Sequence, residues 1–181
     1  METNLCVAGF GGQGVMTLGK FLASATCDST DKKVTFFPSY GAEQRGGTAN
    51  CFVVISDDAI GAPLGDVMDD LIVMNGPSLK KFLRILKPGG TLLINSSIVS
   101  DDIDRTDIKL VKAPVTELAL EMGNAKVLNV IMLGVYVGYT QVVSPEVVWE
   151  TIEHKLGKKS KLLPLNKEAF EKGLKLGIAQ R

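Results

Sequence analysis

Histidine is almost absent from this sequence, and cysteine is scarce. The single histidine, His154, falls in a polar helical segment near the C-terminus, which is typical of a surface residue and argues against histidine-dependent catalysis and His-rich metal sites. The three cysteines, Cys6, Cys27 and Cys51, are widely spaced and form no C-x-x-C pair. We therefore expect free buried thiols in a reducing cytosol, and no iron–sulfur or zinc site held by this chain alone.

Net charge and long apolar runs are also missing. Twenty Lys and Arg balance 20 Asp and Glu, so the overall charge predicts neither a nucleic acid nor an anionic membrane as a partner. The longest apolar run, Val127–Tyr139, contains Asn129 and falls short of the ~20 residues that cross a bilayer. Its glycines, Gly134 and Gly138, have the spacing of a membrane helix pair, but a buried helix that admits a close neighbour is favoured at this length.

No targeting signal is evident. Glu2 and Asn4 stand where a signal peptide has a basic region, so we expect a cytoplasmic protein. At 181 residues, 45% of them hydrophobic, the chain is long enough for one buried core and short for two. Residues 1–181 are therefore predicted to form one domain.

Recognisable catalytic sets are missing as well. The sequence contains no nucleophile paired with a base, no G-x-x-x-x-G-K-[ST] phosphate loop, no G-x-S-x-G and no cluster of metal ligands. Paired acids such as Asp57-Asp58, Asp69-Asp70 and Asp101-Asp102 fall at element boundaries, where capping and solubility account for them. The chain has no evident catalytic residues of its own.

What the sequence does contain is a glycine-rich turn, Gly9-Phe10-Gly11-Gly12-Gln13-Gly14. It follows the apolar run Leu5–Ala8 and precedes Val15–Ala25, where apolar residues recur at helical spacing, so it predicts a strand-to-helix turn. Glycine lets another group approach the backbone, and the helix behind the turn presents unpaired N–H groups and the positive end of its dipole. The turn is therefore a candidate cradle for an anion.

Gly9, Gly11 and Gly14 also fit the dinucleotide fingerprint G-x-G-x-x-G, but its second half is missing. The next strand, Val34–Phe37, ends in Pro38-Ser39-Tyr40 with no carboxylate to hold a ribose, which disfavours nicotinamide binding. Glycines that simply permit close strand–helix packing are the plain alternative. Gln13 points away from that alternative, because a polar ligand or partner explains a buried amide at a helix start more readily than packing does.

A second informative stretch follows that strand, from Ser39 to Thr48. It is too rich in glycine and charge for a regular element, and loops between strands of a compact domain often carry function. Arg45 offers planar donors for a carboxylate or phosphate beside the open backbone of Gly46-Gly47, unless it only pairs with Glu43. Ligands bind beyond the carboxyl ends of strands in such sheets, so we expect this loop and the glycine turn to share one mouth.

The remaining pattern alternates strands with helices and ends in helices. The fold class predicted is α/β, a Rossmann-like mostly parallel sheet flanked by helices, with a helical C-terminal cover from Val115 onward. The expected strands are Leu5–Ala8, Val34–Phe37, Thr48–Ser56 (covered on both faces), Leu71–Met74, Thr91–Ile94 and Ile108–Val111. The later expected helices are one capped by Ser78 and stopped by Lys87-Pro88-Gly89-Gly90, then Thr116–Met122, Val127–Thr140, one capped by Ser144, and a last from Asn166.

Four segments together carry a family resemblance. They are the glycine turn with Val15, the segment Pro38–Gly47, Ile60 with Pro63, and Asn129 with Leu133-Gly134. In this order and over nearly the whole chain, they resemble the gamma subunit of 2-oxoacid:ferredoxin oxidoreductases. Either glycine segment alone would be weak, and the two together are quite specific.

The resemblance implies an activity that composition does not show. Such enzymes oxidatively decarboxylate a 2-oxoacid with coenzyme A, giving an acyl-CoA, CO2 and reduced ferredoxin. Their alpha and beta subunits hold thiamine diphosphate with Mg2+, and iron–sulfur clusters sit in the beta subunit or a small delta subunit. The gamma subunit packs against these subunits on the coenzyme A side and holds no cofactor alone, so the isolated chain is expected to be inactive.

The same resemblance suggests which residues meet coenzyme A and the partner subunits. The candidate binding residues belong to the two glycine segments, and no catalytic or metal-binding residue is assigned: Gly9, Gly11, Gly12, Gln13, Gly14, Ser39, Tyr40, Glu43, Arg45, Gly46 and Gly47. Among substrates 2-oxoglutarate is favoured, with pyruvate and branched-chain 2-oxoacids as alternatives. A free-standing nucleotide-binding oxidoreductase and a scaffold subunit without a ligand remain as other functions.

Overall fold

The computed structural model describes residues 1–39, 47–100, 102–157 and 160–181. Its strands are β1 (Glu2–Phe10), β2 (Lys33–Ser39), β3 (Thr48–Ser56), β4 (Met68–Val73), β5 (Leu86–Asn95) and β6 (Lys109–Ala113). Its helices are α1 (Val15–Ser29), α2 (Gly76–Phe82), α3 (Val115–Glu121), α4 (Leu128–Thr140), α5 (Pro145–Leu156) and α6 (Leu163–Ala179), with short 3₁₀ turns η2 (Leu83–Ile85) and η3 (Ala125–Val127).

The strands form one six-stranded sheet in the order β2-β3-β1-β4-β5-β6. β1, β4, β5 and β6 are paired in parallel, and β3 is antiparallel to both β1 and β2. Five strands therefore point the same way and only β3 runs against them, which confirms the predicted mostly parallel sheet. The carboxyl ends of β1, β2 and β4 all reach the same edge of this sheet.

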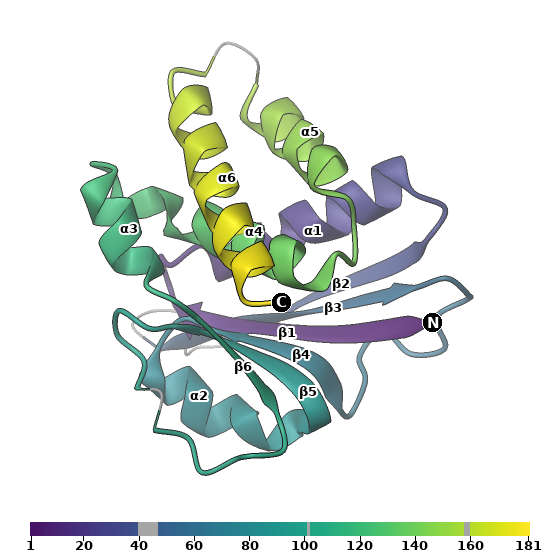
Figure 1. Ribbon diagram of the computed structural model, residues 1–181. Helices are drawn as coiled ribbons and strands as arrows, with labels where there is room; N and C mark the ends of the chain where they lie inside the picture. Colours follow the sequence, from purple (N-terminus) through teal and green to yellow (C-terminus); the bar gives the residue numbers. More distant parts are fainter. Residues whose placement is uncertain (40–46, 101, 158–159) are drawn as a thin grey trace.

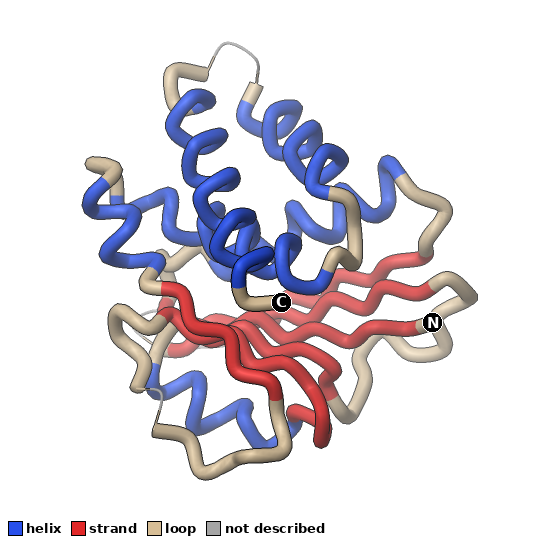
Figure 2. The backbone as a smooth tube through the Cα atoms, viewed as in Figure 1, coloured by secondary structure: helices blue, strands red, loops and turns tan. Residues whose placement is uncertain are grey.

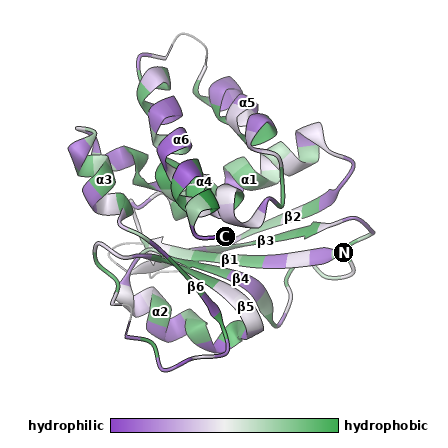
Figure 3. Cartoon of the chain, viewed as in Figure 1, coloured by the Kyte–Doolittle hydropathy of each residue, from purple (hydrophilic) through white to green (hydrophobic). Residues whose placement is uncertain are grey.

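Helices cover the two faces of the sheet unequally (Figures 1 and 2). α1, α4, α5 and α6 lie on one face, and α2 lies on the other. The layer nearest the sheet on the first face includes α4, which is apolar along almost its whole length (Figure 3). This arrangement confirms the helical C-terminal cover.

Side chains of the central strands alternate between the two cores. Leu5 and Val7 of β1 join the core beneath α1 and α4, whereas Cys6 and Ala8 join the core beneath α2. β3 is buried on both faces over most of its length, as the sequence predicted. Burial of both faces requires apolar residues at consecutive positions, which is the pattern of a central strand.

The cysteines only partly match expectation. Cys6 and Cys51 are free and buried, but Cys27, near the end of α1, is free and exposed. Burial raises the pKa of the Cys51 thiol to about 12 and that of Cys6 further still, so these two remain protonated at neutral pH. The prediction of three buried thiols was wrong for Cys27 because α1 turns that position to solvent.

The glycines of α4 confirm the close approach of a neighbouring helix. A Cβ at Gly134 or Gly138 would overlap the α6 backbone at Phe170 and Leu174. α6 carries two glycines at the same spacing, and a Cβ at Gly173 or Gly177 would overlap carbonyl oxygens of α4. Small residues on both sides thus allow two helix backbones to touch.

Several predicted boundaries differ from the structure, and three of them concern how a helix begins or ends. Asn75, not Ser78, caps α2, since the Asn75 Oδ1 accepts a hydrogen bond of 2.8 Å from the Ser78 N–H. The Lys87–Gly90 segment does not end the helix but forms the first part of β5, because the chain has already left α2 through η2. α6 begins at Leu163 rather than Asn166, with Pro164 in its first turn. The cap of α5 at Ser144 is confirmed.

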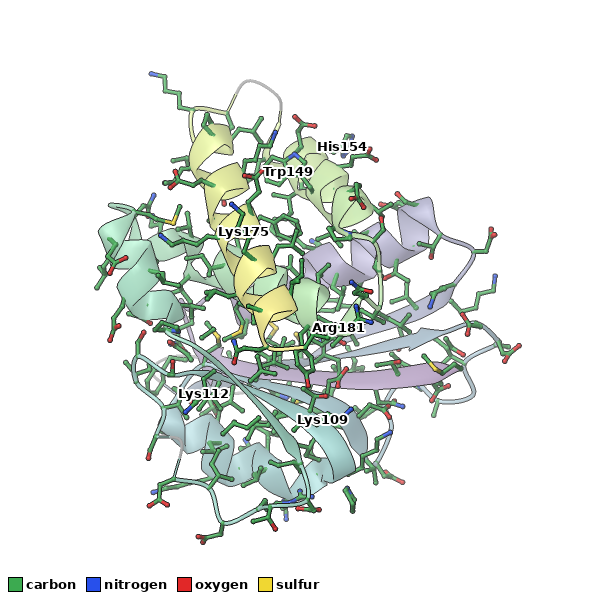
Figure 4. The ribbon with its side chains drawn as sticks, viewed as in Figure 1. Lys109, Lys112, Trp149, His154, Lys175 and Arg181 are labelled. Atoms are coloured by element: carbon green, nitrogen blue, oxygen red, sulfur yellow. The ribbon has the colours of Figure 1, made fainter. Side chains whose placement is uncertain are left out.

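Two further features bear on the excluded functions. His154 is exposed and lies on α5, away from the sheet (Figure 4). Within the described ranges, no helix combines the length and the apolar character that a membrane crossing requires.

Candidate functional site

The glycine turn joins the carboxyl end of β1 to the start of α1. Gly12 and Gly14 have φ values of 95° and 70°, a left-handed region in which a side chain would be strained. The Gln13 N–H donates to the Phe10 carbonyl over 3.2 Å, and α1 begins with the bond from the Leu18 N–H to the Gly14 carbonyl, 2.9 Å. The predicted strand-to-helix turn is confirmed.

Gln13 finds both of its partners inside the chain. Its Oε1 accepts a hydrogen bond of 2.7 Å from the Phe10 N–H, and its Nε2 donates to the carbonyl of Met74 over 3.0 Å. Gly9 permits this, since a Cβ there would lie 2.6 Å from Gln13 Oε1 and 2.8 Å from Met74 Cβ. The amide is half-buried rather than buried, and its hydrogen bonds within the chain account for it without a ligand or partner.

Asn129, at the start of α4, supports the turn from another side. Its Nδ2 donates to the Gly14 carbonyl over 3.3 Å, and a Cβ on Gly14 would lie 2.5 Å from that same nitrogen. Gly14 thus serves two needs, a left-handed backbone and room for Asn129. The polar interruption of an apolar helix was the sequence signal for this contact, although it did not reveal the partner.

A cavity of about 350 Å³ opens beside the turn, on the β3 side of β1. Its walls combine open glycine backbone with the exposed ring of Phe10 and the first turn of α1. The lining residues are Phe10, Gly11, Gly12, Gly14, Val15, Met16, Thr17 and Ala49.

The positive end of α1 at this cavity is not neutralised by a side chain of its own first turn. No side chain caps the helix, and its first turn contains no acidic residue. The first N–H groups of a helix have no partner within it and carry the positive end of its dipole. Without a cap or an acidic residue, the start of this 15-residue helix therefore favours binding of an anion. The geometry supports the anion cradle inferred from the sequence.

The second loop is described only at its two ends. Tyr40, Glu43, Arg45 and Gly46 lie outside the described residues, as do Gly41, Ala42 and Gln44, and only Ser39 and Gly47 can be placed. Ser39 pairs with Asn50 and Thr48 pairs with Phe10, so both ends of the loop reach the edge that carries the glycine turn. The predicted shared edge is confirmed for these ends, and the roles of the residues between them remain a prediction.

The strand order adds a reason against a dinucleotide site. β3 lies between β1 and β2, so the end of β2 is two strands from the glycine turn, about 10 Å away. Ser39 ends β2 without a carboxylate. Neither the residue nor its distance suits the ribose contact of a nicotinamide cofactor.

Polar residues that the sequence reasoning missed end the next two strands. Asn95, at the end of β5, donates from Nδ2 to Thr116 Oγ1 over 2.8 Å, and Asn75 follows β4 as the cap of α2. Asn75 Nδ2, Ser78 Oγ and Asn95 Oδ1 are buried and have no hydrogen-bond partner among the described residues. Polar residues that directly follow buried apolar runs were the signal that could have found them.

The family model described as "Pyruvate ferredoxin/flavodoxin oxidoreductase" matches residues 4–176 of the chain. Among curated proteins, the ketoisovalerate oxidoreductase subunit VorA of Methanothermobacter thermautotrophicus is 37% identical over 174 residues. That match covers 95% of this chain and 36% of VorA, so the chain spans about a third of the length of that relative.

Two solved structures share the fold along almost the whole chain. One is the gamma subunit of a keto/oxoacid ferredoxin oxidoreductase from Geobacter sulfurreducens, with a TM-score of 0.88, 26% identity and coverage of 99% of this chain and 98% of that one. The other is a 2-oxoglutarate:ferredoxin oxidoreductase from Magnetococcus marinus, solved with 2-oxoglutarate, coenzyme A and succinyl-CoA bound. It has a TM-score of 0.89 and 28% identity, covering 98% of this chain and 31% of that one.

Proposed function

The chain belongs to the pyruvate ferredoxin/flavodoxin oxidoreductase family, and we propose that it works as the gamma subunit of a 2-oxoacid:ferredoxin oxidoreductase complex. In this proposal the complex converts a 2-oxoacid and coenzyme A into an acyl-CoA and CO2 and passes the electrons to ferredoxin. The chain contributes a face for coenzyme A and for its alpha, beta and delta partners. It carries out no chemical step alone.

The observation that carries the proposal is the open start of α1 beside its cavity. Coenzyme A is rich in phosphate, and unpartnered N–H groups at a helix start are suited to a phosphate oxygen. Phe10, Val15 and Met16 add an apolar wall to the same cavity for the uncharged part of the ligand. The Magnetococcus marinus protein, of which 31% matches this chain, was solved with coenzyme A bound, which supports coenzyme A as the ligand class.

We propose that Arg45 supplies a second anion contact. Ser39 and Gly47, the described ends of its loop, lie at the edge that carries the glycine turn. A guanidinium in that loop would meet a phosphate or an acidic residue of a partner subunit with paired donors.

The other cofactors of the proposed reaction belong, in this proposal, to the partner subunits. Among the described residues no three His, Cys, Asp or Glu side chains are grouped so that they could hold a metal ion. We propose that the partner subunits hold thiamine diphosphate with Mg2+ and the iron–sulfur clusters, as the family resemblance implies. Electron transfer to ferredoxin is likewise assigned to them.

The substrate is proposed as a 2-oxoacid, with 2-oxoglutarate tested first. The names of similar proteins divide among ketoisovalerate, 2-oxoglutarate and pyruvate, at 37%, 32% and 30% identity. An anaerobic pull-down of the tagged chain from its own cells should recover thiamine and iron–sulfur subunits. The purified complex should reduce an artificial acceptor with coenzyme A and one of these 2-oxoacids. Recovery of the chain alone, without such activity, would contradict the proposal.

A charge placed in the first turn of α1 tests the anion cradle. Thr17 is exposed and lines the cavity, so Thr17→Glu brings a carboxylate to the place where the phosphate is proposed to bind. The same carboxylate interacts favourably with the helix dipole, by about 0.3–1 kcal/mol. We expect the variant complex to keep or raise its Tm while the KM for coenzyme A rises about tenfold.

Thr17→Gln is the matched control, since it has a similar size without the charge. Its KM for coenzyme A should stay within about twofold of wild type. An unchanged KM in Thr17→Glu would instead favour a scaffold role with no coenzyme A contact in this chain.

A further inference from the structure

Gln13 lies between the carboxyl ends of β1 and β4, where an open α/β sheet usually has a crevice. The chain leaves β1 through α1 on one face of the sheet and leaves β4 through α2 on the other face, so the carboxyl ends of β1 and β4 diverge there (Figure 1). In open α/β sheets that divergence is the usual place for a ligand. Here the Gln13 amide spans it, from the Phe10 N–H after β1 to the Met74 carbonyl after β4.

The amide fills the crevice rather than lining it. Gln13 Oε1 and the Met74 side chain lie so close to Gly9 that a Cβ on this residue would overlap both. The Met74 N–H meanwhile donates to the Ala8 carbonyl over 2.8 Å, which draws the end of β4 against β1. The open cavity beside the turn lies on the opposite side of β1, toward Ala49 of β3.

We infer that Gln13 is a positioning residue that closes the crevice between β1 and β4, fixes the glycine turn, and so directs the anionic ligand to the cavity between the start of α1 and β3. This inference rests on the proposed function for the identity of the ligand. In this inference Gln13 acts by holding the turn rather than by contacting the ligand, because its amide oxygen and its amide nitrogen each form a hydrogen bond within the chain.

Gln13→Glu tests the inference in a single variant, because protonation of the introduced carboxyl at low pH should restore the lost hydrogen bond. A protonated glutamic acid can accept from the Phe10 N–H and donate to the Met74 carbonyl, whereas the carboxylate can only accept. No described charged side chain hydrogen-bonds to Gln13, Phe10 or Met74, so the introduced carboxyl itself should control the response. The Met74 carbonyl opposes the charged form, whereas the Phe10 N–H and the positive end of α1 favour it, so the pH at which the response appears reports the balance of these influences on the introduced carboxyl.

The first readout is the hydrogen exchange of the Phe10 amide in the purified chain, compared with wild type at each pH. Gln13→Met should lose protection at every pH, and Gln13→Glu should lose it only as pH rises. Protection that persists in Gln13→Met would overturn the closed crevice. This readout needs no ligand, so it holds even if Thr17→Glu shows that coenzyme A is not bound here.

The second readout is the KM for coenzyme A in the assembled oxidoreductase. Relative to wild type, it should rise about fivefold in Gln13→Glu between pH 5.5 and 8, with little change in kcat, because one hydrogen bond is lost and a negative charge is added beside the turn. Gln13→Met should show the increase at both pH values. An exchange effect without any change in KM would overturn the positioning role.

Gln180→Glu is the matched control. Gln180 forms the same kind of two-bond amide pair, accepting from the Lys112 N–H over 3.0 Å and donating to its carbonyl over 2.9 Å. This pair lies on β6, the edge strand three positions from β1 in the sheet. The KM ratio of Gln180→Glu should stay flat with pH, and a rise equal to that of Gln13→Glu would overturn the inference.

Discussion

Gly173→Ala is expected to destabilise the chain by more than ~3 kcal/mol, a large part of the 5–15 kcal/mol that holds a typical domain. The added Cβ would overlap the carbonyl oxygen and carbon of Ile131. Both are backbone atoms, so no side-chain rotation relieves the overlap and α4 and α6 must separate. Urea denaturation of the purified chain, followed by circular dichroism, measures the loss.

A second glycine provides the control for Gly173→Ala. Gly76 opens α2, and a Cβ there would meet no atom within 4 Å. Gly76→Ala should therefore match wild type or gain up to ~1 kcal/mol, because alanine restricts the unfolded chain and favours the helix. A loss below ~1 kcal/mol in Gly173→Ala would show that the two helices can part without cost.

Tyr136→Phe is expected to cost about 2 kcal/mol at pH 8 and less at pH 4.5. Tyr136 is fully buried, and its hydroxyl donates to Asp70 Oδ2 over 2.9 Å. Asp70 lines a cavity of about 710 Å³ on the amino-terminal edge of the strands. A hydrogen bond to a charged group is worth about 1.5–3 kcal/mol, and more than one to its neutral form. Tyr139→Phe is the control, since the Tyr139 hydroxyl hydrogen-bonds to no described residue and its removal should cost under ~0.5 kcal/mol.

The same pair sets a pH dependence of stability. Burial raises the pKa of Asp70 above its usual 3.8, and hydrogen bonds from Tyr136 and Thr91 oppose that rise only in part. The unfolded carboxyl thus ionises at lower pH than the folded one, so stability falls as pH rises from about 4 through the folded pKa. The lowered pKa values of Asp69 and Asp57 act in the opposite sense, at lower pH.

Asp70→Asn isolates the Asp70 contribution. The amide oxygen can still accept from Tyr136, and no charge is buried. Unfolding free energies measured at pH 4.5, 6 and 8 should therefore fall with pH in wild type relative to the variant. Parallel curves for the two proteins would contradict a raised pKa for Asp70.

Local signals in the sequence predicted the local structure well. The glycine turn, the cap at Ser144 and the spacing of Gly134 and Gly138 each depend on residues within one turn of the chain. The segment Lys87–Gly90 was wrongly predicted to end a helix, because Pro and Gly also suit an exposed strand start, as in β5. Local rules alone do not separate these two outcomes.

Contacts between distant segments could not be predicted in this way. Met74, the partner of Gln13, lies 61 residues further along the chain, and Asn129 reaches Gly14 across 115 residues. The need for glycine at Gly173 and Gly177 becomes clear only from the α4 backbone that they contact. The sequence thus located the candidate site, whereas its internal bonding had to come from the folded chain.

The pairing of Gln180 with Lys112 has a consequence for how the molecule behaves among its own copies. An edge strand offers a row of free peptide groups that can template another chain, which is a common start of aggregation. The Gln180 side chain imitates a peptide of an incoming strand and takes both groups of Lys112 on β6. A seventh strand would find both peptide groups of Lys112 already hydrogen-bonded, so one side chain blocks strand addition at this position of the edge strand.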